Sequence, residues 1–116
     1  MLPGMAEFTA KKVSRHVALT TAFQLIHEVD QRQVCTVRKL LLSNVTNGNV
    51  NVRVCYVPNG GTAGIGNALL WDYSLSSNEF IELAEGDMFR GVGLVAQAAS
   101  NDSVTLKFAG EEENAI

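Results

Sequence analysis

The chain has 116 residues, of which 47% are hydrophobic and 18% charged, and its formal net charge is −3. This length suits one domain that buries its own core. The nine basic residues are dispersed, and the one cluster, Lys11, Lys12 and Arg15, is too small to follow a phosphate backbone, so we expect no nucleic acid partner. No apolar run approaches the ~18–20 residues of a membrane span, so we expect no membrane partner either.

Short apolar runs alternate with clusters of Asn, Gly, Ser, Asp or Pro along the whole chain, and the helical period is absent. This pattern predicts the all-β class, as an antiparallel β-sandwich of about eight strands with jelly-roll or other Greek-key topology. An immunoglobulin-like sandwich is the alternative. In chain order, the expected strands cover residues 12–19, 23–29, 34–45, 50–56, 68–75, 79–83, 91–99 and 104–109.

The clearest turn signal is the Asn-Gly pair at 47–48, which lies between two apolar runs and suits the positive φ angles of a type I′ turn. We therefore predict a hairpin between 34–45 and 50–56, with Val54 opposite Leu41.

In that hairpin the two cysteines, Cys35 and Cys55, lie several residues out of register. Cys55 falls opposite about Leu40, so the two sulfur atoms are too far apart to bond. We expect two buried thiols, as in a protein of a reducing compartment.

The ends of the chain are expected to lie outside the fold. Residues 1–12 are predicted to form an arm, 13–110 the β-sandwich domain, and 111–116 a solvated acidic tail. The first five residues lack the basic-then-apolar layout of a secretion signal, so we expect folding in cytoplasm.

Catalytic and metal-binding patterns are missing from the sequence. The only histidines are His16 and His27, with no His-x-His or Cys-x-x-Cys spacing, and we expect both to be on the surface or half-buried. The best grouping, His27 with Glu28 and Asp30, places neighbouring residues on opposite faces of a strand. There is no Gly-x-Ser-x-Gly elbow. We expect no enzyme activity, no metal and no cofactor.

Two further segments have a plain structural interpretation. The carboxylates of Glu79, Glu82, Glu85 and Asp87 are expected to form a solvated rim around a turn at 84–87. The glycine-rich segment 59–67 has no lysine and leads into a strand, so it is a surface loop and not a phosphate loop.

The region from about 18 to 112 resembles small β-sandwich virion proteins of tailed bacteriophages, of the capsid decoration (cement) type. The resemblance lies in a strand ending in Ser43-Asn44, a strand exit Val54-Cys55-Tyr56-Val57-Pro58-Asn59-Gly60-Gly61, and a closing strand ending Lys107-Phe108-Ala109-Gly110-Glu111. It implies a non-enzymatic structural protein that stabilises an assembled head. A tail, neck or fibre component is the alternative.

The resemblance also implies a location and partners. The protein would be part of a virion made in host cytoplasm, forming a homo-oligomer, with a trimer favoured, that binds the major capsid protein or another virion protein. A carbohydrate- or receptor-binding module is a further alternative, but it needs exposed aromatic rings, and we expect most of these in the core. The candidate partner contacts come from the arm and the loop: Phe8, Lys11, Lys12, Gly60, Gly61, Thr62 and Ile65.

Overall fold

The computed structural model describes residues 11–30, 33–58, 60–83, 86–88 and 91–114, without the side chains of 86–88 and 114. Within these ranges the chain forms nine strands and one 3₁₀ turn. They are β1 (Lys11–Ala18), β2 (Gln24–Glu28), β3 (Gln33–Asn44), β4 (Val50–Val57), the turn η2 (Ile65–Asn67), β5 (Ala68–Leu75), β6 (Phe80–Glu82), β7 (Gly86–Met88), β8 (Gly93–Ala98) and β9 (Val104–Asn114).

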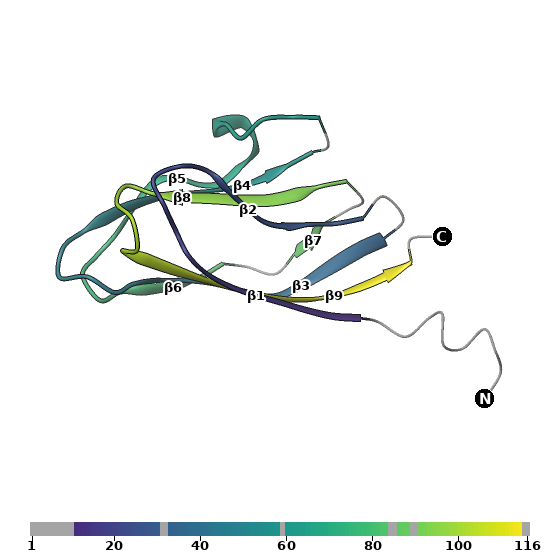
Figure 1. Ribbon diagram of the computed structural model, residues 1–116, viewed down its shortest axis with the longest axis horizontal. Coiled ribbons are helices and arrows are strands. Elements are labelled where there is room, and N and C mark those ends of the chain that lie inside the picture. The colour runs from purple at the N-terminus through teal and green to yellow at the C-terminus, as the bar shows by residue number, and fades with distance from the viewer. Residues whose placement is uncertain (1–10, 31–32, 59, 84–85, 89–90, 115–116) are drawn as a thin grey trace.

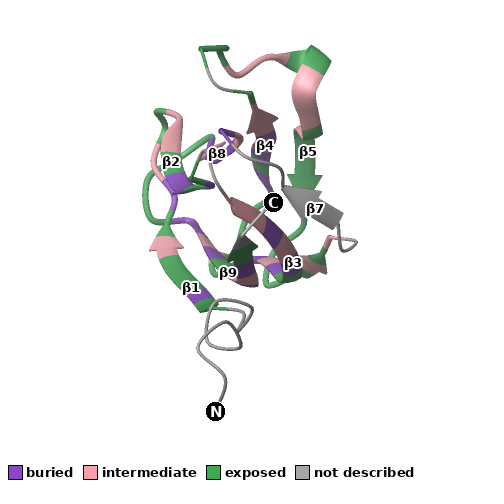
Figure 2. Cartoon of the chain, turned by 90° about the vertical axis from the view of Figure 1, so that its right-hand side faces the viewer, coloured by how far each residue is buried: buried purple, intermediate pink, exposed green. Residues whose placement is uncertain are grey.

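The strands form two sheets that pack face to face, as Figure 1 shows from the side and Figure 2 from one end. Sheet A has the order β1-β9-β3-β6, with β7 also paired to β3, and sheet B has the order β2-β8-β4-β5. Every pairing is antiparallel. The predicted all-β sandwich is confirmed, whereas its assignment as jelly roll or immunoglobulin-like stays a prediction.

The core lies between the sheets because alternate residues of each strand point inward. In β4, Val50, Val52 and Val54 are buried, while Asn51 and Arg53 point outward. The largest fully buried side chains are Phe108, Leu19, Leu40, Leu42, Leu75, Leu94, Leu106, Val29, Val37, Val52 and Val54.

The predicted strand positions agree with the structure where alternation is strong. The strand predicted at 68–75 has the bounds of β5, and every other predicted strand except the last begins and ends within two residues of the observed one. The turn predicted at 84–87 is wrong in its second half. Residues 86–88 form β7, which pairs with Cys35–Val37 of β3, and a run of three residues is too short to show a period.

The predicted hairpin between β3 and β4 is wrong, because the two strands belong to different sheets. Both edges of β3 are occupied, by β9 on one side and by β6 and β7 on the other, and both edges of β4 are occupied by β8 and β5. Neither Asn47 nor Gly48 has a positive φ. The segment 45–49 therefore carries the chain from one sheet to the other.

Asn44 holds this crossing together. Its side-chain Nδ2 donates to the carbonyl oxygens of Gly48, Leu75 and Ser76 at 2.8, 3.0 and 3.1 Å. Its Oδ1 accepts from the backbone N–H and the hydroxyl of Thr46 at 2.9 and 2.7 Å. One buried amide thus joins the end of β3 to the end of β5 in the opposite sheet.

Cys35 and Cys55 are buried thiols, as predicted, but for a different geometric reason. Cys35 is on β3 in sheet A and Cys55 is on β4 in sheet B. The two thiols are therefore separated by their positions in different sheets and not by the register of a hairpin.

The predicted acidic tail is wrong for residues 111–114, which extend β9 between β1 and β3. Glu112 pairs with Lys11 on one side and Cys35 on the other, and it is only 6% exposed. A glycine allows this close approach, since a Cβ on Gly110 would lie 2.8 Å from the carbonyl oxygen of Thr36. Residues 115–116 and the arm residues 1–10 lie outside the described residues, while residues 11 and 12 belong to β1.

Candidate functional site

Strand β1 forms one edge of sheet A. It pairs with β9 through eight consecutive residues without a shift in register. No other described strand pairs with its outer side. Lys11, Lys12, Arg15 and His16 are exposed along it, and Val13 is buried, as the mostly exposed ribbon of β1 in Figure 2 shows. Backbone N–H and C=O groups at such an edge are available for pairing with another strand.

The other described edges are short or interrupted. β2 has a bulge between Leu25 and His27, and β5 has two irregularities in its pairing with β4 and a positive φ of 53° at Asp72. β6 and β7 have three residues each. Bulges such as that of β2 block pairing between molecules, whereas β6 and β7 follow the same side of β3 and together form one interrupted edge. Among the described edges, β1 is therefore the one with a long, regular register.

The two edges of sheet A carry opposite charge. β1 has Lys11, Lys12 and Arg15, all exposed. At the other edge, Glu82 ends β6 and is exposed, as is Glu79 just before it. Of the predicted acidic rim, Glu79 and Glu82 are confirmed as exposed.

Glu85 and Asp87 are the other two members of that rim. Glu85 lies outside the described residues, and the side chain of Asp87 is not described.

The glycine-rich loop packs against the outer side of β4. Asn67 fixes its shape, accepting from the Gly64 N–H at 3.1 Å and donating to the Thr62 carbonyl at 3.0 Å. The Cys55 thiol donates to the Gly64 carbonyl at 3.7 Å, and burial raises the pKa of this thiol. Ile65, held at the start of the turn η2, is 73% exposed.

The structure separates the predicted partner contacts into two groups. Lys11 and Lys12 lie on β1 in sheet A, and Phe8 lies outside the described residues. The remaining four lie in the loop next to sheet B, on the opposite side of the sandwich in Figure 1, and three of them are exposed with no large side chain: Gly60, Gly61 and Thr62. One continuous surface through both groups is therefore not supported.

A shallow groove of about 120 Å³ lies beside the loop, where β2, β8 and the end of β4 meet. Its described lining is glycine and apolar side chains, with Glu28 as the titratable residue. The lining residues are Leu25, Glu28, Val57, Pro58, Gly60, Gly61, Gly91, Gly93 and Val95.

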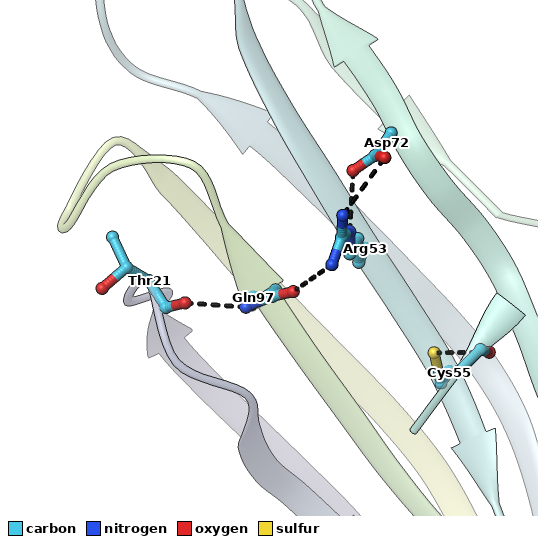
Figure 3. A network of polar contacts seen from close by, with 6 residues as sticks. Thr21, Arg53, Cys55, Asp72 and Gln97 are labelled. Atoms are coloured by element: carbon cyan, nitrogen blue, oxygen red, sulfur yellow. Dashed lines mark hydrogen bonds and ion pairs between the residues drawn. The ribbon is translucent and has the colours of Figure 1, made fainter. Parts of the chain in front are cut away.

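The outer face of sheet B carries a polar network that the sequence does not reveal (Figure 3). Arg53 donates to both carboxylate oxygens of Asp72, at 2.7 and 3.2 Å, and to the side-chain oxygen of Gln97 at 3.2 Å. Gln97 in turn donates to the Thr21 carbonyl at 2.7 Å. The guanidinium holds the pKa of Asp72 below its usual value. The network links β5, β4 and β8 with the segment before β2.

Two aromatic rings accompany this network, and Phe108 is the one described aromatic side chain that is buried in the core. The Arg53 guanidinium lies 4.1 Å from the centre of the Trp71 ring, and the Phe23 ring stacks on Trp71 at 6.4 Å between centroids. Tyr73 and Phe80 are exposed. The expectation that most aromatic residues are in the core is wrong for the described residues. Because the contacts of Trp71 are made within the chain, this face does not favour sugar stacking.

The two histidines differ in environment. His16 is exposed on β1, as predicted, but the prediction for His27 is wrong, since it is only 7% exposed and points between the sheets. Its Nε2 lies 3.2 Å from a carboxylate oxygen of Glu112. Glu28 is exposed, so it does not converge with His27. Among the described residues, no group of three His, Cys, Asp or Glu side chains could hold a metal ion.

The same part of the chain contains no helix that is long and apolar enough to cross a membrane.

The fold defines a small antiparallel β-sandwich, and the comparisons with known proteins agree with that class. No family model matches the chain, and no curated protein does. A solved structure is similar to 90% of this chain and 85% of its own, with a TM-score of 0.55 and 13% sequence identity. It comes from work described as "Bacillus endospore appendages form a novel family of disulfide-linked pili". At this identity the likeness shows a shared fold.

Proposed function

We propose that this chain is a non-enzymatic structural subunit whose copies join through the edges of sheet A. The observation that carries the proposal is β1, an exposed edge of eight residues in unbroken register. Addition of a strand to such an edge supplies backbone hydrogen bonds, each with a net contribution of about 0.5–1.5 kcal/mol. The partner strand we propose is the β6–β7 edge of a second copy.

Strand direction supports this partner. β1 is antiparallel to β9, β9 to β3, and β3 to both β6 and β7. Hence β1 runs opposite to β6 and β7 of its own chain. A second copy in the same orientation therefore meets β1 with antiparallel strands, and sheet A continues from copy to copy. Such a head-to-tail contact builds an open polymer unless the rotation between copies closes a ring.

The length and charge of the two edges also support the β6–β7 edge as the partner of β1. The β6–β7 edge follows β3 from Ser43 to Cys35, and between the two strands the Leu83 N–H donates to the Leu40 carbonyl at 2.8 Å. This stretch of β3 is about as long as the eight-residue strand β1. Lys12 and Asp87 lie at the same level of sheet A, because Lys12 pairs with Glu111, Glu111 with Thr36 and Thr36 with Asp87. A copy added without a shift would therefore place Lys12 opposite the position of Asp87 in β7, whereas two β1 edges would repel each other.

The structural neighbour also supports a role in assembly, since the protein it contains forms pili. Those pili are described as disulfide-linked. In this chain Cys35 and Cys55 are both buried, so the assembly that we propose is held by strand pairing and charge and not by disulfides.

A finer proposal is the capsid decoration role implied by the sequence resemblance, in a virion made in host cytoplasm. It differs from open polymerisation in two measurable respects. Copies would form a closed oligomer such as a trimer, and the exposed surface would bind the major capsid protein or another virion protein.

The test is self-assembly of the purified chain, followed by light scattering, sedimentation and negative-stain electron microscopy. We expect filaments above a threshold concentration. Replacing Lys11 and Lys12 by Glu places like charges at the proposed contact, and we expect the threshold to rise about tenfold. Combining Lys12→Glu with Asp87→Lys restores opposite signs at these two level positions and should lower the threshold relative to Lys12→Glu alone.

The matched control is Lys107→Glu, because Lys107 is exposed on β9 in the middle of sheet A and not at an edge. This variant should assemble like the unmodified chain. A discrete trimer that saturates capsid shells would favour the decoration role over the polymer. A monomer at all concentrations that binds no shell would refute both proposals.

A further inference from the structure

His27 reaches the interior of the sandwich through a bulge in β2. Leu25 pairs with Val95 and His27 with Leu94, so Ile26 is the extra residue between them. Strict alternation would send Ile26 and His27 to opposite faces. With the bulge both are buried, at 5% and 7% exposure. Bulges commonly redirect a side chain in this way.

The imidazole then connects the two sheets. Its Nε2 lies 3.2 Å from Oε1 of Glu112, and its ring stacks on Phe108 with 5.2 Å between centroids. Glu112 and Phe108 belong to β9 in sheet A, whereas His27 belongs to sheet B. Despite the short distance, Nε2 lacks hydrogen-bond geometry and has no hydrogen-bond partner among the described residues. The neutral imidazole of His27 is therefore held between the sheets mainly by packing against its neighbours, Phe108 among them.

Charged groups from three strands surround this ring. Glu112 on β9 and Glu28 on β2 favour the protonated imidazole, whereas burial and Arg15 on β1 oppose it. On the strands beside β9, Lys11 and Cys35 are the register partners of Glu112. Burial is the largest influence, and the pKa of His27 is lowered below 6.5.

We propose that the buried imidazole of His27 responds to pH, and that its protonation releases β2 from the sandwich because Glu112 only partly offsets the cost of burying the cation between the sheets. β2 is suited to local opening, since it is an edge strand of five residues that pairs only with β8 among the described strands. This inference does not depend on the proposed assembly, because it concerns the folded chain alone.

The sign follows from linkage. The unfolded chain binds a proton at His27 near pH 6.5, whereas the folded chain binds it only at lower pH because its pKa is lowered. The stability gained by burying the neutral imidazole is fully present above about pH 6.5 and is lost as the pH falls toward the pKa of the folded chain. Below that second pKa the loss is complete.

Amide hydrogen exchange tests the proposal in the full chain. Between pH 7.5 and pH 5 we expect protection factors at 26–28 to fall several-fold more than those of Leu40 and Leu42 in the centre of β3. His27→Phe keeps a ring that can stack on Phe108 and has no titrating group, so its β2 protection should not depend on pH. The matched control is His16→Gln, which alters the exposed histidine and should behave like the unmodified chain.

A second measurement does not rely on a variant. The C–H resonances of the two imidazoles can be followed by NMR during a pH titration, and His27 should titrate below pH 6.5, together with the loss of β2 protection. Titration of His27 above pH 6.5 would overturn the proposal. So would equal loss of protection in β2 and β3, or an unchanged pH dependence in His27→Phe.

Discussion

Replacing Gly110 by Ala tests how tightly β9 packs between its neighbours beyond the predicted end of the domain. A Cβ at this position would lie 2.8 Å from the Thr36 carbonyl oxygen, 2.9 Å from Sγ of Cys35 and 3.4 Å from Cζ of Phe108. The first atom is backbone of the paired strand β3, so it cannot move without disturbing the ladder. Overpacking of this kind costs about 1–3 kcal/mol.

Urea unfolding followed by circular dichroism measures this cost. For a loss of about 2 kcal/mol and a slope of about 2 kcal/mol per molar urea, the midpoint falls by about 1 M with an unchanged slope. The control is Gly66→Ala, because nothing lies within 4 Å of a Cβ at Gly66. Adding Cys35→Ala should recover only part of the loss, since it removes the sulfur contact but not the contact with the Thr36 carbonyl.

Equal midpoints for Gly110→Ala and Gly66→Ala would refute the reasoning. Such a result would mean that β9 separates from β3 near residue 110 at no cost, and residues 111–114 would then form the solvated tail that the sequence suggests.

Three further predictions concern single side chains. Asn44→Ala leaves three carbonyl oxygens without their side-chain donor, and we expect a loss of about 1–3 kcal/mol in urea unfolding; a loss below ~0.5 kcal/mol would contradict its role at the crossing. Arg15→Gln removes a charge that lowers the pKa of His27, so NMR titration should show that pKa moving upward, and no movement would contradict the placement of Arg15. Cys35 and Cys55 are buried, so a thiol reagent should modify both far more slowly in the folded chain than in urea, and fast reaction of either would contradict its burial.

The sequence predicts the strands well because alternation is a local property. In β4, the valines at every second position indicate which face of the strand is buried, even when its neighbouring strands are unknown. Pairing is not local. The Asn-Gly pair at 47–48 has the residue types of a hairpin turn, yet the segment joins two sheets because all edges of β3 and β4 have other partners.

The prediction of a solvated acidic tail is wrong for a related reason. Three successive glutamates look solvated by composition, but an inner strand is held by backbone pairing on both sides. Glu111 and Glu113 place their charge at partly or fully exposed positions, while Glu112 alone turns inward. Composition cannot indicate which strands will flank a segment.

The candidate site is less predictable than the fold. Lys11 and Lys12 are recognisable as a basic pair, but that they lie on the edge strand of sheet A among the described strands follows only from the strand order. The burial of His27 depends on a one-residue bulge, and alternation in the sequence gives no sign of it.

The strand order of sheet A also sets the shape of the proposed polymer. Each copy contributes four strand positions, β1, β9, β3 and the shared β6–β7 line. At about 4.8 Å between strands, copies would repeat every ~19 Å along the filament. Neighbouring strands rotate by about 20–25° with a fixed hand, so each copy would turn the sheet by roughly 80–100°. A filament built this way is a helical ribbon with about four copies per turn, and its two ends are chemically different.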